Sequence, residues 1–232
     1  KEMNINLIAI DEAHCISEWG HNFRPSYRHI FEIRKIIDET PILALTATAT
    51  NDVIKDIQNN LLFKEENLIQ SSFFRGNMSY IVDNIEDKNS RLLKVLNKIK
   101  SSAIIYVGTR KKAKNITNFL INNSLSVNYY HGGLPSDVRA KRQADWTNNQ
   151  TRIMVATNAF GMGIDKEDVK LVVHMDLPST IEAYFQEAGR AGRNGKTAYA
   201  YLLANNSDIS RQEDLLELKY PKIDEIVEGY QN

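Results

Sequence analysis

Residues 6–14 read NLIAIDEAH, a short apolar run followed at once by two acidic residues and a histidine. An apolar run of this length, with polar residues directly behind it, is typical of a strand buried in a parallel sheet. Ligands of such sheets bind at the carboxyl ends of the strands. The stretch therefore predicts a buried strand at 6–10, and it places Asp11, Glu12 and His14 where chemistry is expected.

The rest of the chain alternates strand-like and helix-like segments. The predicted strands are residues 6–10, 42–45, 79–82, 103–107, 126–130, 153–156, 171–174 and 198–203. The predicted helices are residues 28–38, 52–62, 91–99, 113–121, 136–146 and 181–188. Ser136 follows Pro135 and is a good cap for the helix it begins. This order predicts an α/β fold of parallel sheets with helices on both faces.

The strand–helix pattern restarts near Arg75-Gly76-Asn77. We therefore predict a first domain at 1–75, a second at 76–205, and a helical linker at 206–232 that leads into a further domain. The first domain holds too few strands for a complete sheet, and a strand-like run begins almost at Lys1. We expect the chain to be an excerpt of a longer protein, with its first domain truncated on the N-terminal side.

Composition places the chain among ordinary globular proteins, with 42% hydrophobic and 25% charged residues. Lys+Arg and Asp+Glu both number 29, so the net charge does not indicate a nucleic-acid partner. A protein that binds nucleic acid would have to gather its basic residues in local clusters. The single cysteine excludes an internal disulfide and a cysteine-rich zinc site. No apolar run is long enough to span a membrane and no signal peptide is present, so we expect a cytoplasmic protein without a membrane partner.

The two adjacent carboxylates after the first predicted strand suit a nucleotide site. Asp11 could hold Mg²⁺, usually through water, and Glu12 could polarise an attacking water. An acidic loop that caps the next helix would look the same, so both interpretations stay open on this motif alone.

Residues 15–25, CISEWGHNFRP, are aromatic, basic and interrupted by Gly and Pro. Trp19 and Phe23 could stack on bases, and Arg24 could meet a phosphate or a carboxylate. Alternatively, the two aromatic rings pin this loop to the core. After the second predicted strand, residues 45–50 read LTATAT, and their hydroxyl groups, Thr46 and Thr48 included, could bond to His14 or the carboxylates. Thr50 could instead cap the next helix, and both roles are compatible.

Residues 186–193, QEAGRAGR, place Arg190 and Arg193 on one face at a helix end, beside glycines that allow close approach. Two planar, permanently charged guanidinium groups suit the γ-phosphate of a nucleotide. A solvated basic helix end would also be favoured by the helix dipole, but it would not need glycines, which are poor helix formers.

Three more loops follow predicted strands. In ATNAFGMGID (156–165), backbone amides near Gly161 and Gly163 could approach a DNA phosphate, and Asp165 could meet ribose or Mg²⁺-bound water; a tight loop with positive φ is the alternative. The other two loops are 108–112 and 131–133. The local basic residues are Arg110, Lys111, Lys112, Lys114, Arg139, Lys141 and Arg142. Singly, each lysine fits a solvated side chain better than a contact, whereas Thr109, Arg110 and His131 sit at strand ends.

These motifs together resemble the RecQ family of DNA helicases, whose DEAH box runs straight into an aromatic-rich loop. The resemblance extends from Leu7 to about Leu203. It implies two RecA-like domains, ATP and Mg²⁺ as cofactors, single-stranded and duplex DNA as partners, and 3′ to 5′ movement. The family usually has a proline where this chain has Glu167, and that difference touches no chemical group.

The resemblance also implies roles for the residues. Catalysis would fall to Asp11, Glu12, Gln186, Arg190 and Arg193, with Arg193 as the first choice for the arginine finger. Coupling of DNA to ATP hydrolysis would fall to His14, Trp19, Phe23, Arg24, Thr46 and Thr48. DNA contacts would come from Trp19, Phe23, Arg24, Thr109, Arg110, His131, Gly132, Thr157 and Gly161. Nucleotide contacts would come from Gly163, Asp165, Arg190 and Arg193.

The phosphate-cradling loop G-x-x-x-x-G-K-[ST] is absent from this sequence. Gly195-Lys196-Thr197 imitates its end, but Arg190 stands where its first glycine would be, and the segment follows a helix instead of opening one. In RecQ-like proteins the loop lies upstream of the DEAH box, so we expect little or no ATPase activity from this chain alone. Two alternatives remain. One is an RNA helicase of the DEAD/DEAH-box type, against which the loop from Trp19 to Arg24 speaks, and the other is a non-catalytic nucleic-acid-binding fragment.

Overall fold

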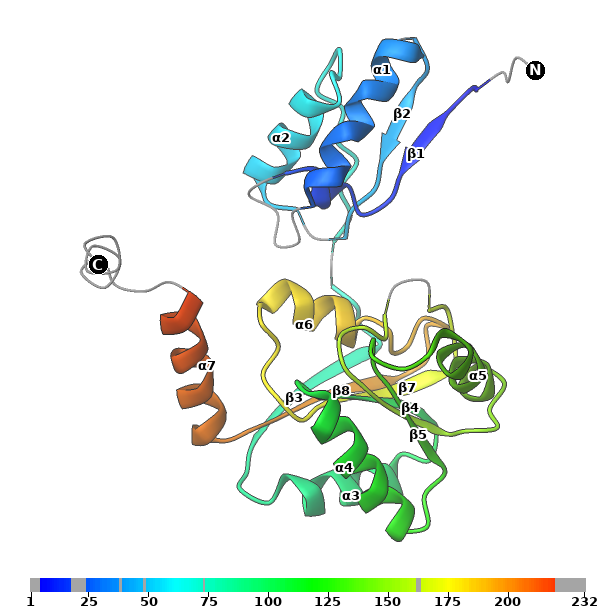
Figure 1. Cartoon of the computed structure of the whole chain (residues 1–232), viewed down its shortest axis with the longest axis vertical. Coiled ribbons are helices and arrows are strands. Elements are labelled where there is room, and N and C mark those ends of the chain that lie inside the picture. Colours follow the sequence, from blue (N-terminus) through cyan, green and yellow to red (C-terminus); the bar gives the residue numbers. More distant parts are fainter. Residues whose placement is uncertain are drawn as a thin grey trace. The chain divides into compact units, whose positions relative to one another are not determined.

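The computed structural model describes residues 5–17, 24–37, 39–47, 49–72, 74–161 and 164–219. It divides into two compact units, residues 1–73 and 74–232 (Figure 1). The division lies two residues before the predicted end of the first domain. Arg75 bonds to backbone carbonyls of the second unit, which explains why it groups with that unit. The predicted α/β class with parallel sheets is confirmed.

The first unit is built on two parallel strands. They are β1 (Ile8–Ile10) and β2 (Ile42–Ala44), accompanied by the 3₁₀ helices η1 (Ala13–Ile16) and η2 (Pro25–Phe31) and by the helices α1 (Glu32–Ile36) and α2 (Asn51–Asn60). One face of the strands packs with α2 in a small core around Ile10, Val53, Ile57 and Leu61. This core places the segments that follow β1 and β2 side by side.

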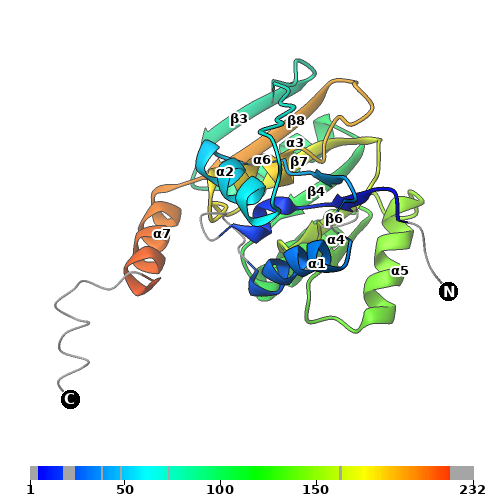
Figure 2. The ribbon, with the colours of Figure 1, turned by 90° about the horizontal axis from the view of Figure 1, so that it is seen from above.

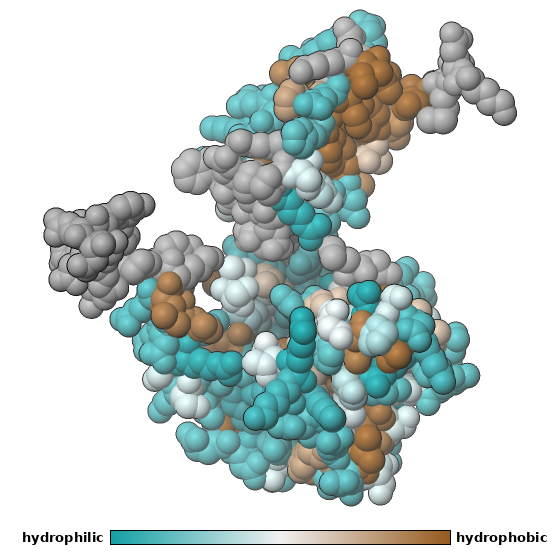
Figure 3. Space-filling model, in the orientation of Figure 1, coloured by the Kyte–Doolittle hydropathy of each residue, from teal (hydrophilic) through white to brown (hydrophobic). Residues whose placement is uncertain are grey.

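The other face of the two strands is open. Leu7, Leu43 and Leu45 alternate with the packed residues and are 54%, 44% and 46% exposed. Figure 3 shows a hydrophobic patch over this part of the unit. A parallel sheet normally has both faces covered, but these leucines stay exposed within the described part of the chain.

The predicted helix at 28–38 differs from the observed segment. The chain turns earlier, as the 3₁₀ helix η2 from Pro25, and becomes α-helical only over Glu32–Ile36. Pro25 occupies the first helical turn, where its fixed φ and missing N–H are tolerated, and Tyr27 N–H bonds to Arg24 O at 2.8 Å. The spacing of isoleucines could not reveal this tighter start, and position 38 lies outside the described residues.

The second unit contains a six-stranded parallel sheet in the order β3-β8-β7-β4-β6-β5 (Figures 1 and 2). The strands are β3 (Met78–Asn84), β4 (Ser102–Tyr106), β5 (Val127–Tyr130), β6 (Ile153–Ala156), β7 (Val169–His174) and β8 (Ala198–Ala204). The helices are α3 (Lys88–Lys98), α4 (Arg110–Asn122), α5 (Ser136–Thr147), α6 (Ile181–Ala188) and α7 (Asn206–Lys219).

Helices cover both faces of this sheet, as predicted. Helices α3 and α4 pack on one face, where β4 contributes Ala103 and Ile105, followed by Val107 just after the strand. Helices α5 and α6 pack on the other face, where β4 contributes Ile104 and Tyr106. This alternation along one strand is what a central parallel strand with two buried faces requires.

Several predicted boundaries were wrong for local reasons. Helix α4 begins at Arg110 and not at residue 113, so the basic run after β4 is helical. Helix α5 has Pro135 as its N-cap residue without a side-chain hydrogen bond, so Ser136 is inside the helix and is not its cap. Strand β3 continues to Asn84 because its backbone pairs with Ala204 regardless of the polar side chains.

Within the described residues, no helix has the length and apolar character needed to cross a membrane.

Candidate functional site

The acidic pair of the first unit follows β1 directly. Glu12 adopts a left-handed backbone conformation with φ 52°, which is uncommon for a residue other than glycine. Its N–H bonds to Asp11 Oδ1 at 2.8 Å, and its Oε2 lies 3.3 Å from Nδ1 of the buried His14. Strained backbone of this kind is often found at functional sites, so the conformation is a reason to look for chemistry at Glu12.

His14 connects the acidic pair to the segment after β2. Its Nδ1 lies 3.0 Å from Thr46 Oγ1, which confirms the predicted contact between these two segments. Backbone hydrogen bonds hold them in place, from Ala13 N–H to Leu45 O at 2.9 Å and from Leu45 N–H to Ile10 O at 2.8 Å. The predicted capping role of Thr50 is confirmed, because its Oγ1 accepts from Val53 N–H. Thr48 lies outside the described residues.

A magnesium ion fits the donors at Asp11. The carboxylate of Asp11 is exposed at the strand end. Among the described residues, no group of three or more His, Cys, Asp or Glu side chains could hold a metal ion on its own. Mg²⁺ usually keeps several waters and binds through one or two carboxylates together with substrate phosphates. A single exposed aspartate beside Glu12 is therefore compatible with Mg²⁺ but not with an all-protein metal cage.

The aromatic loop is only partly described. Trp19 and Phe23 lie outside the described residues, and their predicted DNA contacts stay predictions. Arg24 donates its backbone N–H to Cys15 O at 3.0 Å, and its guanidinium lies 5.9 Å from the centre of the Tyr27 ring. Burial raises the pKa of the Cys15 thiol, and the charge of Arg24 opposes this effect.

In the second unit, most predicted DNA-binding residues meet at one edge of the sheet. The last residues of β4, β5, β6 and β7 are in register, with Tyr106 opposite both Ala156 and His174, and Ala156 opposite Tyr130. The loops that follow these strands therefore leave from the same edge. These loops carry Thr109, His131, Gly132 and Thr157, and Arg110 begins α4 directly after Thr109.

The groups at this edge have partners that the sequence did not show. Thr109 caps α4, because its Oγ1 accepts from Lys112 N–H at 3.1 Å. Lys112, which the sequence placed in the basic cluster, binds Asp176 Oδ1 at 2.6 Å and Met175 O at 3.2 Å. Burial works to raise the pKa of Asp176, but Lys112 and the Gly108 N–H outweigh it and hold the pKa below its ordinary value. Arg110 lies against Gly133, where an added Cβ would come within 2.6 Å of Nη1.

The surroundings of His131 lower the pKa of its imidazole. Burial first, and then the charges of Arg110 and Arg142, lower the pKa of His131 below its ordinary value of 6.5. Its Nδ1 is buried without a hydrogen-bond partner in the described part of the chain, and its ring stacks on Tyr129 with centroids 5.7 Å apart.

This depressed pKa predicts an acid-sensitive second unit. The unfolded chain binds a proton at His131 near pH 6.5 but the folded chain resists it, so stability falls as pH drops from 6.5 through the lower folded pKa. Replacing His131 with asparagine should remove this contribution to the loss of stability at low pH. Urea unfolding from pH 7.5 to 5 would test this prediction, with His29→Asn as the control because the His29 side chain is 73% exposed. Identical pH profiles for His131→Asn and the unchanged chain would contradict it.

The two arginines of residues 186–193 both contact the loop after β6. Arg190 Nη1 donates to Gly161 O at 2.6 Å, while Arg193 Nη1 donates to Asp165 Oδ1 at 2.8 Å and to Ile164 O at 3.1 Å. An added Cβ at Gly161 would lie 2.5 Å from Arg190 Nη2. Gly161 does not have a positive φ, so the tight turn that was the alternative for this loop does not require a glycine at this position. Its missing side chain instead makes room for Arg190. Gly163 lies outside the described residues, and Gln186 is half-buried on α6.

A buried network behind these arginines was missed by the sequence reasoning. His174 Nε2 lies 2.8 Å from Glu187 Oε2, and its ring stacks on Tyr106 with centroids 5.2 Å apart. Tyr106 donates its hydroxyl to Phe160 O at 2.8 Å, and burial raises its pKa. The network thus joins the arginine segment to the loop after β6. The available signal was a histidine at the end of a strand and a glutamate inside residues 186–193.

The turn around Arg193 needs glycine at one position, Gly192. Gly192 has φ 65°, and an added Cβ would lie 2.7 Å from Asn77 Nδ2 and 2.9 Å from Ala198 Cβ. Its carbonyl accepts from Arg75 and from Asn77 at 2.6 and 2.8 Å. Gly195 has a similar φ of 74°, but nothing lies within 4 Å of an added Cβ there.

These two glycines make a matched pair. Gly195→Ala should destabilise the second unit by about 1 kcal/mol, the cost of a left-handed alanine. Gly192→Ala should destabilise it by about 2–4 kcal/mol, because crowding adds to that cost. Equilibrium urea unfolding would measure both, and equal losses would show that the contacts of Gly192 relax without cost.

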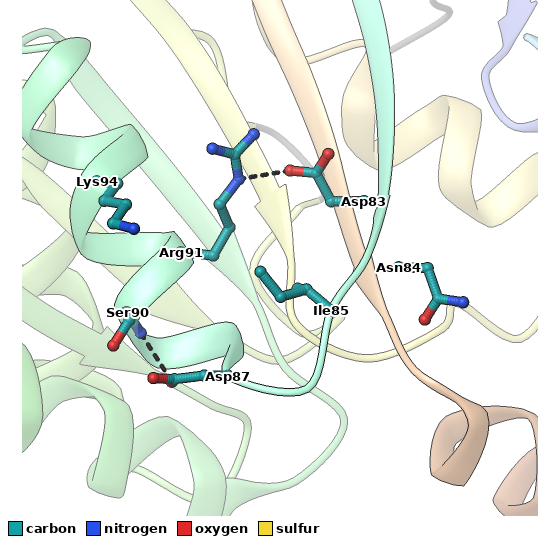
Figure 4. A pocket seen from close by; sticks show the side chains of 7 residues that line it. All are labelled: Asp83, Asn84, Ile85, Asp87, Ser90, Arg91 and Lys94. Carbon is teal, nitrogen blue, oxygen red and sulfur yellow. Dashed lines mark hydrogen bonds and ion pairs between the residues drawn. The ribbon is translucent and has the colours of Figure 1, made fainter.

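A pocket of about 340 Å³ lies where β3 ends and α3 begins (Figure 4). Its lining carries both charges, and Arg91 Nε binds Asp83 Oδ2 across it at 2.6 Å. Asp87 accepts from Ser90 N–H at 3.0 Å, and Ser90 lowers the pKa of Asp87. Arg91 and Asp83 thus pair with each other, and Asp87 caps α3, so neither carboxylate is left for a ligand.

The parallel sheets, with polar groups at their strand ends, define the class of protein: an α/β protein of two units, each matched by a helicase family model. The family of DEAD/DEAH box helicases matches residues 2–57, and the helicase conserved C-terminal domain matches residues 87–195. A solved structure of yeast Dbp5 bound to RNA and ADP BeF3 has a TM-score of 0.72 to this chain, with 20% sequence identity, over 94% of this chain and 58% of that one. At that identity it shows the fold alone.

Sequence comparison identifies the particular family. The chain is 44% identical to the ATP-dependent DNA helicase RecQ of Bacillus subtilis, over 93% of this chain and 37% of the relative. It is also 44% identical to a protein of Acanthamoeba polyphaga mimivirus that is named as an ATP-dependent RNA helicase, over 90% of this chain and 38% of that protein. The chain belongs to the RecQ helicases. It spans less than half the length of these curated relatives.

Proposed function

We propose that the protein to which this chain belongs is an ATP-dependent DNA helicase that moves 3′ to 5′ along single-stranded DNA and separates duplexes. The observation that carries the proposal is the identity to RecQ across 217 residues, which is longer than either unit and so includes both. The geometry agrees, because the acidic pair, the Thr46 contact and the arginine segment all lie at strand ends or beside them.

In this proposal Asp11 would hold Mg²⁺, and Glu12 would accept a proton from the water that attacks ATP. The bound Mg²⁺ supplies charge neutralisation at the phosphates. His14 lies 3.3 Å from Glu12, and Thr46 lies 3.0 Å from His14. Through these two contacts, His14 and Thr46 would couple hydrolysis at Glu12 to the aromatic loop. Arg193 stabilises the γ-phosphate, with Arg190 and Gln186 beside it. Gly163 and Asp165 complete the nucleotide contacts.

The DNA strand would lie along the carboxyl edge of the second unit. Arg110 supplies charge there, His131 and Thr157 supply hydrogen-bonding groups, and Gly132 and Gly161 let backbone amides approach phosphates. Trp19 and Phe23 of the aromatic loop would stack on bases. These roles agree with the common edge on which the second-unit residues lie.

The test uses the protein with its upstream segment restored, so that a phosphate-binding loop is present. We expect single-stranded DNA to stimulate its ATP hydrolysis strongly and RNA of matched length to stimulate it weakly. Equal or stronger stimulation by RNA would move the protein to the RNA helicases, the activity named for the mimivirus relative. A duplex with a 3′ single-stranded tail should be unwound, and a duplex with only a 5′ tail should not.

A second expectation concerns the chain as it stands. It has no G-x-x-x-x-G-K-[ST] loop, so we expect the isolated chain to bind nucleic acid without measurable ATP turnover. Steady ATP turnover by the purified chain, abolished by Glu12→Gln to exclude a contaminant, would contradict this expectation.

A further inference from the structure

The second unit has a basic pocket that the proposed site does not use. Its volume is about 490 Å³, in the range of small-ligand pockets. It is lined by Lys98, Ile99, Lys100, Ser101, Lys170, Thr197, Tyr199 and Tyr201. The lining thus contains three lysines, two tyrosines and two hydroxyl residues, and no acidic residue. Within the described part of the chain, none of the three lysines forms an ion pair.

The pocket lies at the amino ends of the strands. Ser101 precedes β4, Thr197 precedes β8, and Lys170 is the second residue of β7. The predicted DNA-binding loops leave the carboxyl ends of the same strands. Because β4 is five residues long, the two places are roughly 17 Å apart along the strand. The pocket is therefore a separate feature and not an extension of the candidate DNA-binding edge.

A β-bulge presents one of the lysines. Ser102 pairs with Val169 and Ala103 pairs with Leu171, so Lys170 has no partner on β4. Bulges are rare between parallel strands, and they re-aim a side chain next to functional sites. A lysine also interrupts an otherwise buried strand here, with apolar neighbours on both sides. The irregularity brings a positive charge to the pocket that a regular strand would not supply.

The end of α3 does not account for the other lysines. Cations near a helix C-terminus can stabilise its free carbonyls, and this would be a purely structural explanation for Lys98 and Lys100. Those carbonyls already have a cation, because Arg152 donates through Nη2 to Leu96 O and Ile99 O and through Nε to Ser101 O. Arg152 thus fixes the pocket wall and leaves the lysine ammonium groups available to a ligand.

We propose that this pocket binds phosphate groups of a nucleic-acid strand, as a second contact for DNA on the second unit. Ammonium groups without acidic partners are suited to phosphates, and Tyr199 and Tyr201 can add hydroxyl or ring contacts. The site needs no ATP turnover, so it stands apart from the helicase mechanism proposed above. A strand longer than the carboxyl edge would then be held at both ends of the sheet.

The experiment measures binding of a fluorescent 30-nucleotide single strand to the full chain by anisotropy, across a salt series. Lys100→Ala with Lys170→Ala removes two lysines and leaves Lys98 at the helix end. We expect affinity to fall roughly tenfold and the salt slope to fall by about 1.4, which is two phosphate contacts at about 0.7 each. The matched control, Lys55→Ala with Lys64→Ala, removes the same charge from two exposed lysines and should change neither.

The outcomes separate this site from the proposed DNA-binding edge. Arg110→Ala reports on the edge. If only this variant lost affinity for the single strand, the proposal for the pocket would be overturned and the proposed DNA-binding edge would stand. Equal losses in the pocket and control variants would also overturn it, since only general charge would matter. Pyrophosphate binding that the pocket variant loses, with oligonucleotide affinity unchanged, would assign the pocket to a free phosphate ligand instead. Photo-crosslinks from the strand to residues 197–201 would support the proposal directly.

Discussion

Replacing Glu12 with glutamine, in the protein extended by its upstream segment, is expected to lower ATP hydrolysis by about 10²–10⁴-fold. Affinity for nucleotide should stay within about threefold, because an effect on the transition state alone changes turnover and not binding. Glutamine keeps the size of the side chain but cannot accept a proton. The Glu12 side chain is 32% exposed, so it can reach solvent water, while Oε2 stays 3.3 Å from His14.

The chain offers a close control for this substitution. Glu32 also has a carboxylate oxygen beside a histidine, at 3.4 Å from His29 Nδ1, but this pair lies on the exposed surface of η2 and α1. Glu32→Gln should leave turnover unchanged. Single-turnover hydrolysis and fluorescent nucleotide binding would measure the two variants side by side. Normal turnover in the Glu12 variant, or an equal loss in the Glu32 variant, would remove Glu12 from its proposed role.

The sequence was sufficient for the order of strands and helices in this chain because the pattern is strongly periodic. Short apolar runs such as 103–107 are too short for helices and are bounded by turns, so they could only be buried strands. The pattern was insufficient where backbone geometry departs from a regular element. Pro25 starts a 3₁₀ helix and Lys170 lies at a bulge, and the hydropathy pattern specifies neither of these backbone geometries.

The contacts of the candidate site also fall into those that the sequence could predict and those that it could not. The contact between His14 and Thr46 was predictable, because two neighbouring parallel strands end at the same edge and each is followed by polar residues. The pairing of Lys112 with Asp176 was not predictable, since it depends on β7 lying beside β4 although other elements separate them in sequence. Lys112 therefore looked like a free basic residue, and its partner was not recognised at all.

The two arginines of the second unit differ in a way that the sequence could not show. Arg190 is half-buried and holds the carbonyl of Gly161, so its guanidinium is already engaged in the loop after β6. Arg193 is 37% exposed, and its partner Asp165 is 80% exposed. Exposed ion pairs are weak, so Arg193 can exchange Asp165 for a phosphate at little cost. For the function proposed above, these contacts favour Arg193 over Arg190 as the arginine finger, and we propose a positioning role for Arg190.

Arg193→Ala, in the protein with its upstream segment, should therefore lower ATP hydrolysis by about 10³–10⁵-fold, the usual contribution of an arginine finger. Its stability should change by about 1 kcal/mol, because an exposed ion pair and one hydrogen bond to Ile164 O are lost. Arg190→Ala should instead lower stability by about 1–3 kcal/mol, since it leaves the Gly161 carbonyl without its partner. The exposed Arg211 on α7 provides the control, and Arg211→Ala should alter neither quantity.

Hydrolysis, urea unfolding and single-strand DNA binding should be measured on all three variants, because each role predicts a different combination. A finger residue loses hydrolysis alone, a positioning residue loses stability together with hydrolysis, and a DNA contact loses affinity for the strand. Arg193→Lys sharpens the distinction. Lysine keeps the charge but not the planar fork, so a finger that binds in bidentate fashion should remain largely inactive. Selective loss of DNA binding in Arg193→Ala, with hydrolysis intact, would place this arginine on the DNA instead of the nucleotide.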